Sequence, residues 1–130
     1  MSLEKMFGDT ALKARELLIK GVACTPRQAW NLAGVELFHR ESYLSKGCPR
    51  AAFIGLCEKG LVKGVAAGDY SAGTMNKQYT LKALKMLREN PEWRFTKSRW
   101  WLEVTKDNQI SHNHQLDVLI ALYVNGFLNI

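Results

Sequence analysis

The chain is poor in cysteine and has no long apolar segment. Its three cysteines cannot all pair within one chain, and none of them form a CxxC spacing, which argues against a disulfide framework. Unpaired thiols are typical of a reducing compartment, so we expect a cytoplasmic protein. The longest apolar run, residues 118–124, is far shorter than the roughly 20 residues that span a bilayer, so we expect no membrane partner.

Sequence motifs for common enzyme chemistry are also missing. The chain has neither GxxxxGK[ST] nor HExxH, and no nucleophile–base pair or carboxylate pair stands out. We therefore do not expect an enzyme, a cofactor or a metal. One weaker alternative stays open, a small-ligand or metal-dependent enzyme that uses His112, His114 and Asp117. His114 and Asp117 are three residues apart and share a helix face, although an ordinary polar helix N-terminus explains them equally well.

The composition is that of a folded globular protein. Of the 130 residues, 47% are apolar and 23% are charged, and we expect residues 1–130 to form a single domain, because domains cluster near ~100–150 residues. The pI near 9.4 and the net charge of +6 favour anionic partners.

Helix signals recur along the chain and predict a mainly α, compact multi-helix fold. The sharpest signal is at residues 25–28, where Thr25 suits an N-cap, Pro26 the first helical position and Gln28 the third, from which it can complete a capping box. Asp9 is predicted to cap an earlier helix that ends at Gly21.

The most apolar helix is predicted near the C-terminus, over residues 115–124. After Asp117 it is apolar on almost every side, with Ser111 or Asn113 as candidate caps. Such a helix belongs either in the centre of the core or at a subunit interface, so we expect a buried C-terminal helix.

The segment from Cys48 to Leu81 could contain one short β-hairpin. A capped helix is followed by Leu61-Val62, a glycine-rich stretch and the alternating run Tyr79-Thr80-Leu81. This order resembles the recognition helix, wing and return strand of winged helix-turn-helix proteins. The resemblance implies phosphate contacts from Lys59, Lys63 and Lys77, and base contacts from the helix that holds Arg50. A structural helix-loop-helix is the other interpretation, and residues 76–89 themselves fit a helix better than a strand.

The most informative segment is Asn76 to Asp107. It holds eight lysines and arginines against four acidic residues, a net charge of +4 out of the chain's +6, together with three of the four tryptophans. Cations interleaved with aromatic residues can neutralise phosphates and stack on bases. We therefore predict a small cytosolic binding module whose basic segment 77–106 binds nucleic acid. The expected contact residues are Lys77, Lys82, Lys85, Arg94, Lys97, Arg99 and Trp100.

Protein interaction is the competing hypothesis. Trp100 and Trp101 are adjacent, so on a helix their side chains diverge by about 100° and cannot both face one core. We expect one of them, or Trp93, to be partly exposed, and at least two of the three to pack in the core. A partly exposed tryptophan often marks a recognition surface. A homo-oligomer could form through this tryptophan face or through the last helix.

Overall fold

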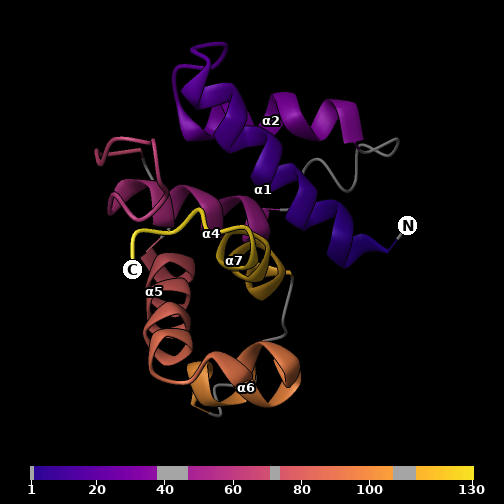
Figure 1. The fold of residues 1–130 in the computed structure, drawn as a ribbon, viewed down its shortest axis with the longest axis vertical. Helices are drawn as coiled ribbons and strands as arrows, with labels where there is room; N and C mark the ends of the chain where they lie inside the picture. Colours follow the sequence, from indigo (N-terminus) through magenta and orange to yellow (C-terminus); the bar gives the residue numbers. More distant parts are fainter. Residues whose placement is uncertain (1, 38–46, 71–73, 107–113) are drawn as a thin grey trace.

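The computed structural model describes residues 2–37, 47–70, 74–106 and 114–130 (Figure 1). These residues form six α-helices and one short 3-10 helix, which confirms the mainly α prediction. The elements are α1 (Leu3–Ile19), α2 (Pro26–Leu37), α4 (Gly47–Glu58), α5 (Thr74–Glu89), η1 (Pro91–Phe95), α6 (Lys97–Thr105) and α7 (Gln115–Val124).

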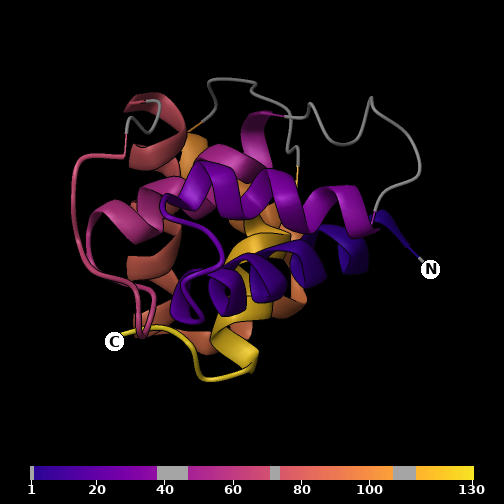
Figure 2. The ribbon, with the colours of Figure 1, turned by 90° about the horizontal axis from the view of Figure 1, so that it is seen from above.

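The apolar helix α7 lies in the interior of the molecule. It packs against α1, α4 and α5, and Figures 1 and 2 both show it enclosed by these helices. Leu119 and Leu122 on α7 are fully buried, and Leu116 is nearly so. The expected buried C-terminal helix is thus confirmed. Most of its apolar side chains are covered inside one chain, whereas Val124 near its end is 65% exposed.

The helix starts agree with the sequence at α2 but not at α1. The backbone N–H of Gln28 donates to Oγ1 of Thr25 at 3.2 Å, while Oε1 of Gln28 accepts from the N–H of Cys24 at 2.8 Å. The predicted box therefore forms, with its return arm one residue earlier than usual. The predicted cap of α1 is wrong, because Ser2 is the N-cap and Asp9 lies in the helix interior.

The structure does not support a winged-helix hairpin. Residues 61–70 and 74–81 contain no strand, and the expected return strand, Tyr79 to Leu81, lies within α5. Val62 instead forms a single antiparallel bridge with Leu128 near the C-terminus. The backbone N–H of Lys63 donates to the carbonyl of Phe127 at 2.8 Å, which extends that contact. The extended residues after α4 thus pair with a distant segment that their local sequence does not specify.

Substitutions in α7 should be more damaging than loss of the α2 cap. We expect Leu119→Ala or Leu122→Ala to lower the free energy of unfolding by about 2–5 kcal/mol, because each leaves a cavity in a packed interior. Thr25→Ala should cost about 0.5–2 kcal/mol, and Gln28→Ala less. Urea melts can rank the four variants. Parent-like melting of both leucine variants would contradict the central position of α7.

Candidate functional sites

The structure removes Trp100 from the predicted nucleic-acid contacts. Its side chain is fully buried, and that of Trp101 is 4% exposed. Trp101 packs edge-on against Tyr79 of α5, with ring centroids 5.8 Å apart. Of the three tryptophans in the segment, Trp93 is the partly exposed one, as one of the two expected alternatives had it, while Trp100 and Trp101 both lie in the core. Both are covered because α6 packs against both α5 and η1, rather than against one flat face.

Two of the predicted lysines are engaged in ion pairs. Nζ of Lys77 lies 3.3 Å from Oε1 of Glu58, and both side chains are mostly covered. Lys97 pairs with two carboxylates, those of Glu4 and Asp117. A cation whose charge is balanced by the protein contributes less to binding an external phosphate, so these two lysines are weak candidates.

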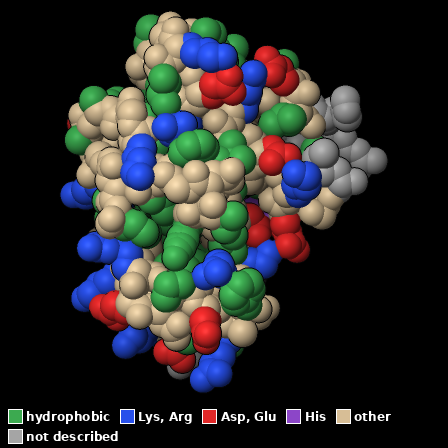
Figure 3. All heavy atoms as spheres, viewed as in Figure 1, with side chains coloured by type: hydrophobic (Ala, Val, Ile, Leu, Met, Phe, Trp, Pro, Cys, Tyr) green, Lys and Arg blue, Asp and Glu red, His purple; other side chains and the backbone are tan. Residues whose placement is uncertain are grey.

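Of the other four predicted cations, Lys85 and Arg99 are exposed, whereas Lys82 and Arg94 are half-buried. Nζ of Lys82 donates to the backbone carbonyl of Glu103 at 3.2 Å, and Lys85 is exposed on α5. The guanidinium of Arg94 lies over the ring of Phe95, while that of Arg99 lies 6.0 Å from the centroid of Trp93. Figure 3 shows basic side chains along one edge of the molecule over α5, with acidic side chains among them.

An aromatic hollow lies beside these cations, where η1 meets α6. Its volume is about 370 Å³, and it is lined by Asn90, Glu92, Trp93, Phe95, Thr96 and Arg99. The Phe95 side chain is 73% exposed, the most exposed of the large apolar side chains in the described part of the chain. We had not predicted Phe95 as a contact. Asn90-Pro91 ends α5 four residues before Phe95, and this part of the sequence indicates that Phe95 does not belong to the apolar stripe of α5.

The N-terminus of α6 borders the same hollow. Thr96 is its N-cap, yet the hydroxyl makes no capping bond and instead donates to the carbonyl of Trp93 at 3.4 Å. The N–H groups of the first turn thus lack a side-chain cap from Thr96. Such groups, with the positive end of the helix dipole, favour an anion.

A second cluster of charged groups joins three helices. Nζ of Lys97 on α6 lies 2.5 Å from Oε2 of Glu4 on α1 and 2.7 Å from Oδ1 of Asp117 on α7. The other oxygen of Asp117 lies 2.8 Å from Nδ1 of His114. The Asp117 side chain is only 5% exposed, whereas that of Glu4 is 60% exposed. One carboxylate is therefore fixed in the interior and the other lies at the surface.

The predicted pairing of His114 with Asp117 is present, but it does not form a metal site with other described residues. His114 is the N-cap of α7, with a φ of 69°, and its ring stacks on that of Phe7 at 4.7 Å. Among the described residues, no three His, Cys, Asp or Glu side chains gather as a metal ion would require. His112 and the two candidate caps, Ser111 and Asn113, lie outside the described residues.

The charged cluster lies at one end of a cleft between α1 and α7. The cleft has a volume of about 420 Å³, and Glu4, Lys97 and Asp117 are among its lining residues. Arg94 also lines it, and the remaining wall is largely apolar. It is the one described hollow in which buried and exposed charged groups converge.

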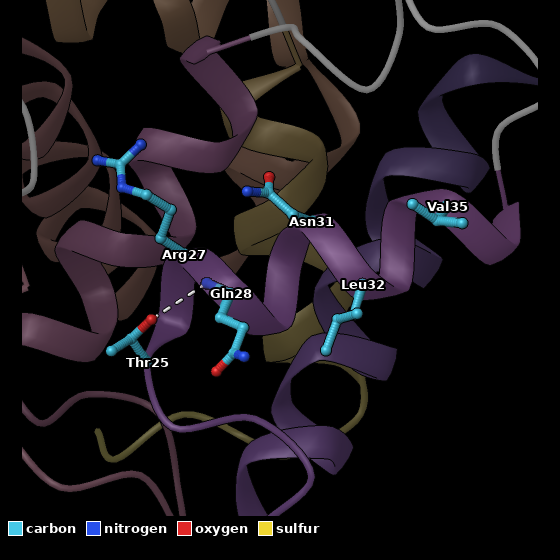
Figure 4. Close-up of a pocket in the computed structure, with 6 residues that line it drawn as sticks. All are labelled: Thr25, Arg27, Gln28, Asn31, Leu32 and Val35. Atoms are coloured by element: carbon cyan, nitrogen blue, oxygen red, sulfur yellow. Dashed lines mark hydrogen bonds between the residues drawn. The ribbon is translucent and has the colours of Figure 1, made fainter.

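A third hollow follows the outer surface of α2 (Figure 4). It measures about 410 Å³, and all its lining residues come from α2 or its cap. Leu32 and Val35 are 41% and 66% exposed there. Because its lining residues all come from one helix and its cap, this hollow brings no side chains together from distant parts of the chain, and we do not consider it a candidate site.

Comparison with known proteins places the chain in a family without assigning an activity. A family of unknown function, DUF6979, matches residues 4–129. The chain belongs to this family. Membership extends over nearly all the elements described above, from the first turn of α1 to the residues that follow α7. No curated protein matches the chain, and no solved structure matches it. Within the described residues, none of the helices has the length and apolarity needed to cross a membrane.

The ion pairs of Lys97 predict a pH dependence of stability. Partial burial lowers its pKa, but the hydrogen bonds to Asp117 and Glu4 outweigh burial and raise the pKa of Lys97 overall. A raised folded pKa gives stabilisation that is complete below the unfolded value of about 10.4 and is lost as pH rises through the folded value. Urea melts should show a larger loss of unfolding free energy between about pH 10 and about pH 12 in the parent than in Lys97→Met. An equal loss of unfolding free energy in the two proteins would show that the ion pairs of Lys97 contribute nothing to stability.

Proposed function

We propose that this protein binds single-stranded nucleic acid through the end of the molecule formed by α5, η1 and α6. The observation that carries this proposal is the exposed Phe95 at an aromatic hollow beside several accessible cations. We call this surface the basic-aromatic end. It comprises Lys82, Lys85, Arg88, Trp93, Phe95 and Arg99.

The aromatic residues support contact with unpaired bases. Base stacking on a protein side chain needs an exposed ring, and Phe95 provides one while Trp93 lines the same hollow. In a duplex the base faces are already stacked on one another, so an aromatic hollow of this kind suits a single strand better. Asn90 and Glu92 place polar groups beside the rings, where they can meet base edges.

The neighbouring cations support contact with phosphates. Lys85 and Arg88 are exposed near the end of α5, and Arg99 is exposed beside the first-turn N–H groups of α6. Arg99 lines the aromatic hollow, and Lys85 and Arg88 line a separate hollow with Glu89 on α5. A strand could then present a base to the rings and successive phosphates to Arg99 and to the cations of α5. The acidic residues Glu89 and Glu92 lie among them and limit the net charge, which favours moderate affinity with strong salt dependence.

A cytoplasmic location is part of this proposal. All three cysteines are free, although Cys24 is exposed and only Cys57 is fully buried. Free thiols are compatible with a reducing compartment. Neither the rings nor the cations distinguish DNA from RNA, and both are included in the test below.

Protein interaction is the alternative that the test must separate. Its original support was the apolar last helix, and α7 is covered by helices of its own chain. The aromatic hollow could instead receive a peptide segment, and a homo-oligomer would mask Phe95. Light scattering at the monomer mass across a wide concentration range would count against the homo-oligomer.

Binding to a labelled oligonucleotide should depend steeply on salt. Three phosphate contacts, from Lys85, Arg88 and Arg99, predict a slope of about −2 in log K against log salt for a single strand, at ~0.7 per phosphate. Fluorescence anisotropy with single-stranded oligo-dT and oligo-U measures the slope, and the matching duplex should bind more weakly. Absence of binding at low salt and high micromolar protein would remove the proposal.

Two variants with matched controls test the surface itself. Phe95→Ala should weaken binding by about 1–3 kcal/mol, the range for one stacked base. Leu102→Ala removes another exposed apolar side chain of the same end, 57% exposed and outside the hollow, and should bind normally.

Charge reversal provides the second pair of variants. The double variant Lys85→Glu, Arg88→Glu should abolish measurable binding, because it converts phosphate contacts into repulsion. The double variant Lys59→Glu, Lys63→Glu makes the same change in net charge at exposed positions outside the segment 77–106. Equal losses in both double variants would mean that overall charge alone governs binding and that the basic-aromatic end is not the site.

A further inference from the structure

One wall of the cleft between α1 and α7 is apolar. Leu12 of α1 and Ile120, Ala121 and Val124 of α7 line it. At the base, Gly8 meets α7 so closely that a Cβ built on it would lie 3.0 Å from the Cβ of Ala121. The helices therefore touch without a large side chain between them. The Val124 side chain, 65% exposed, leaves the wall open to solvent.

Positive charge is concentrated at one end of this wall. Lys97 is the first residue of α6, where a lysine opposes the helix dipole and adds to the positive potential of the first-turn N–H groups. Arg94 also lines the cleft, and its guanidinium lies 5.6 Å from the ring centroid of Tyr123 on α7. The hydrogen bonds that raise the pKa of Lys97 favour its charged form, so the ammonium is present at neutral pH.

The two carboxylates at Lys97 differ in how firmly they are held. Asp117 is 5% exposed and has a second partner in His114, so it is a fixed counter-ion. Glu4 is 60% exposed and belongs to the first turn of the first helix. An exposed ion pair of this kind contributes little to stability, because solvent competes for both charges. Glu4 is therefore the exchangeable partner.

We propose that this cleft binds a small amphipathic monocarboxylate, such as a medium-chain alkyl acid. The ligand carboxylate takes the position of the Glu4 carboxylate at Lys97, and the alkyl chain lies along Ile120, Ala121 and Val124. The exchange keeps one negative charge at Lys97 in place of another, and the displaced Glu4 carboxylate, already 60% exposed, is hydrated at the surface. A volume of about 420 Å³ is within the range of small-ligand sites.

The charge count favours a carboxylate over a phosphate. Besides Glu4, three cations (Lys5, Arg94 and Lys97) and two carboxylates (Asp9 and Asp117) line the cleft, and Lys5 pairs with Asp9 at 3.4 Å. A monoanion in place of Glu4 balances these charges, whereas a dianion would leave an excess negative charge. A phosphate would also leave the apolar wall uncovered. The site is thus distinct in chemistry from the basic-aromatic end, and its occupation does not depend on whether that surface binds nucleic acid.

Calorimetry with octanoate tests the proposal, with octan-1-ol and octylamine as ligands of equal chain length without the carboxylate. Octanoate should bind, and the other two should bind at least tenfold more weakly. Glu4→Gln should tighten octanoate binding by up to about fivefold, because the internal competitor is removed at the small cost of an exposed ion pair. Equal binding of all three ligands would overturn the proposal.

Two further variants locate the ligand at this cleft. Lys97→Met should weaken octanoate binding more than tenfold. Because that change also leaves the buried Asp117 without its lysine, Val124→Asp provides an independent test at an exposed position: it places a negative charge on the apolar wall and should weaken binding to a similar degree. Circular dichroism checks that each variant is folded. Unchanged octanoate affinity in folded Val124→Asp would place the ligand elsewhere and overturn the proposal.

Discussion

Burial of α7 is the constraint on which the rest of the structure depends. Its apolar residues point in almost every direction, so the chain must surround it, and α1, α4 and α5 do so from different sides. α1 and α5 each contribute an apolar stripe and keep a polar face for solvent, whereas α4 is buried over all of residues 52–57. Every functional surface discussed above therefore lies on a helix whose other side is held against the same core.

The burial of α7 also determines where the charged cluster forms. Asp117 is the third residue of α7, and it is buried because its helix is buried. A buried carboxylate needs partners, because an isolated charge in an apolar interior is very costly. Lys97 and His114 supply them, and Glu4 joins from the opposite end of the sequence. The cluster both connects α1, α6 and α7 and leaves one ammonium at the edge of a cleft.

The two proposed sites lie on either side of the start of α6. Arg94 and Lys97 line the cleft, whereas Thr96 and Arg99 line the aromatic hollow. The short 3-10 helix η1 makes this division, because it turns the chain between α5 and α6 and leaves Phe95 exposed. A helix without that break would have kept the same aromatic residues in a continuous apolar stripe.

The sequence alone determined the features that depend on near neighbours. Thr25, Pro26 and Gln28 set the start of α2, and the apolar run after Asp117 identified the central helix, because capping and helical periodicity act within a few residues. Tertiary structure alone decided which residues are exposed. Trp100 looked like a recognition residue and is buried, Lys97 looked like a phosphate contact and is paired with Glu4 from 93 positions away, and Val62 meets Leu128 rather than a hairpin partner. These outcomes depend on contacts between segments far apart in the chain, and local patterns carry no information about which distant segment will cover a side chain.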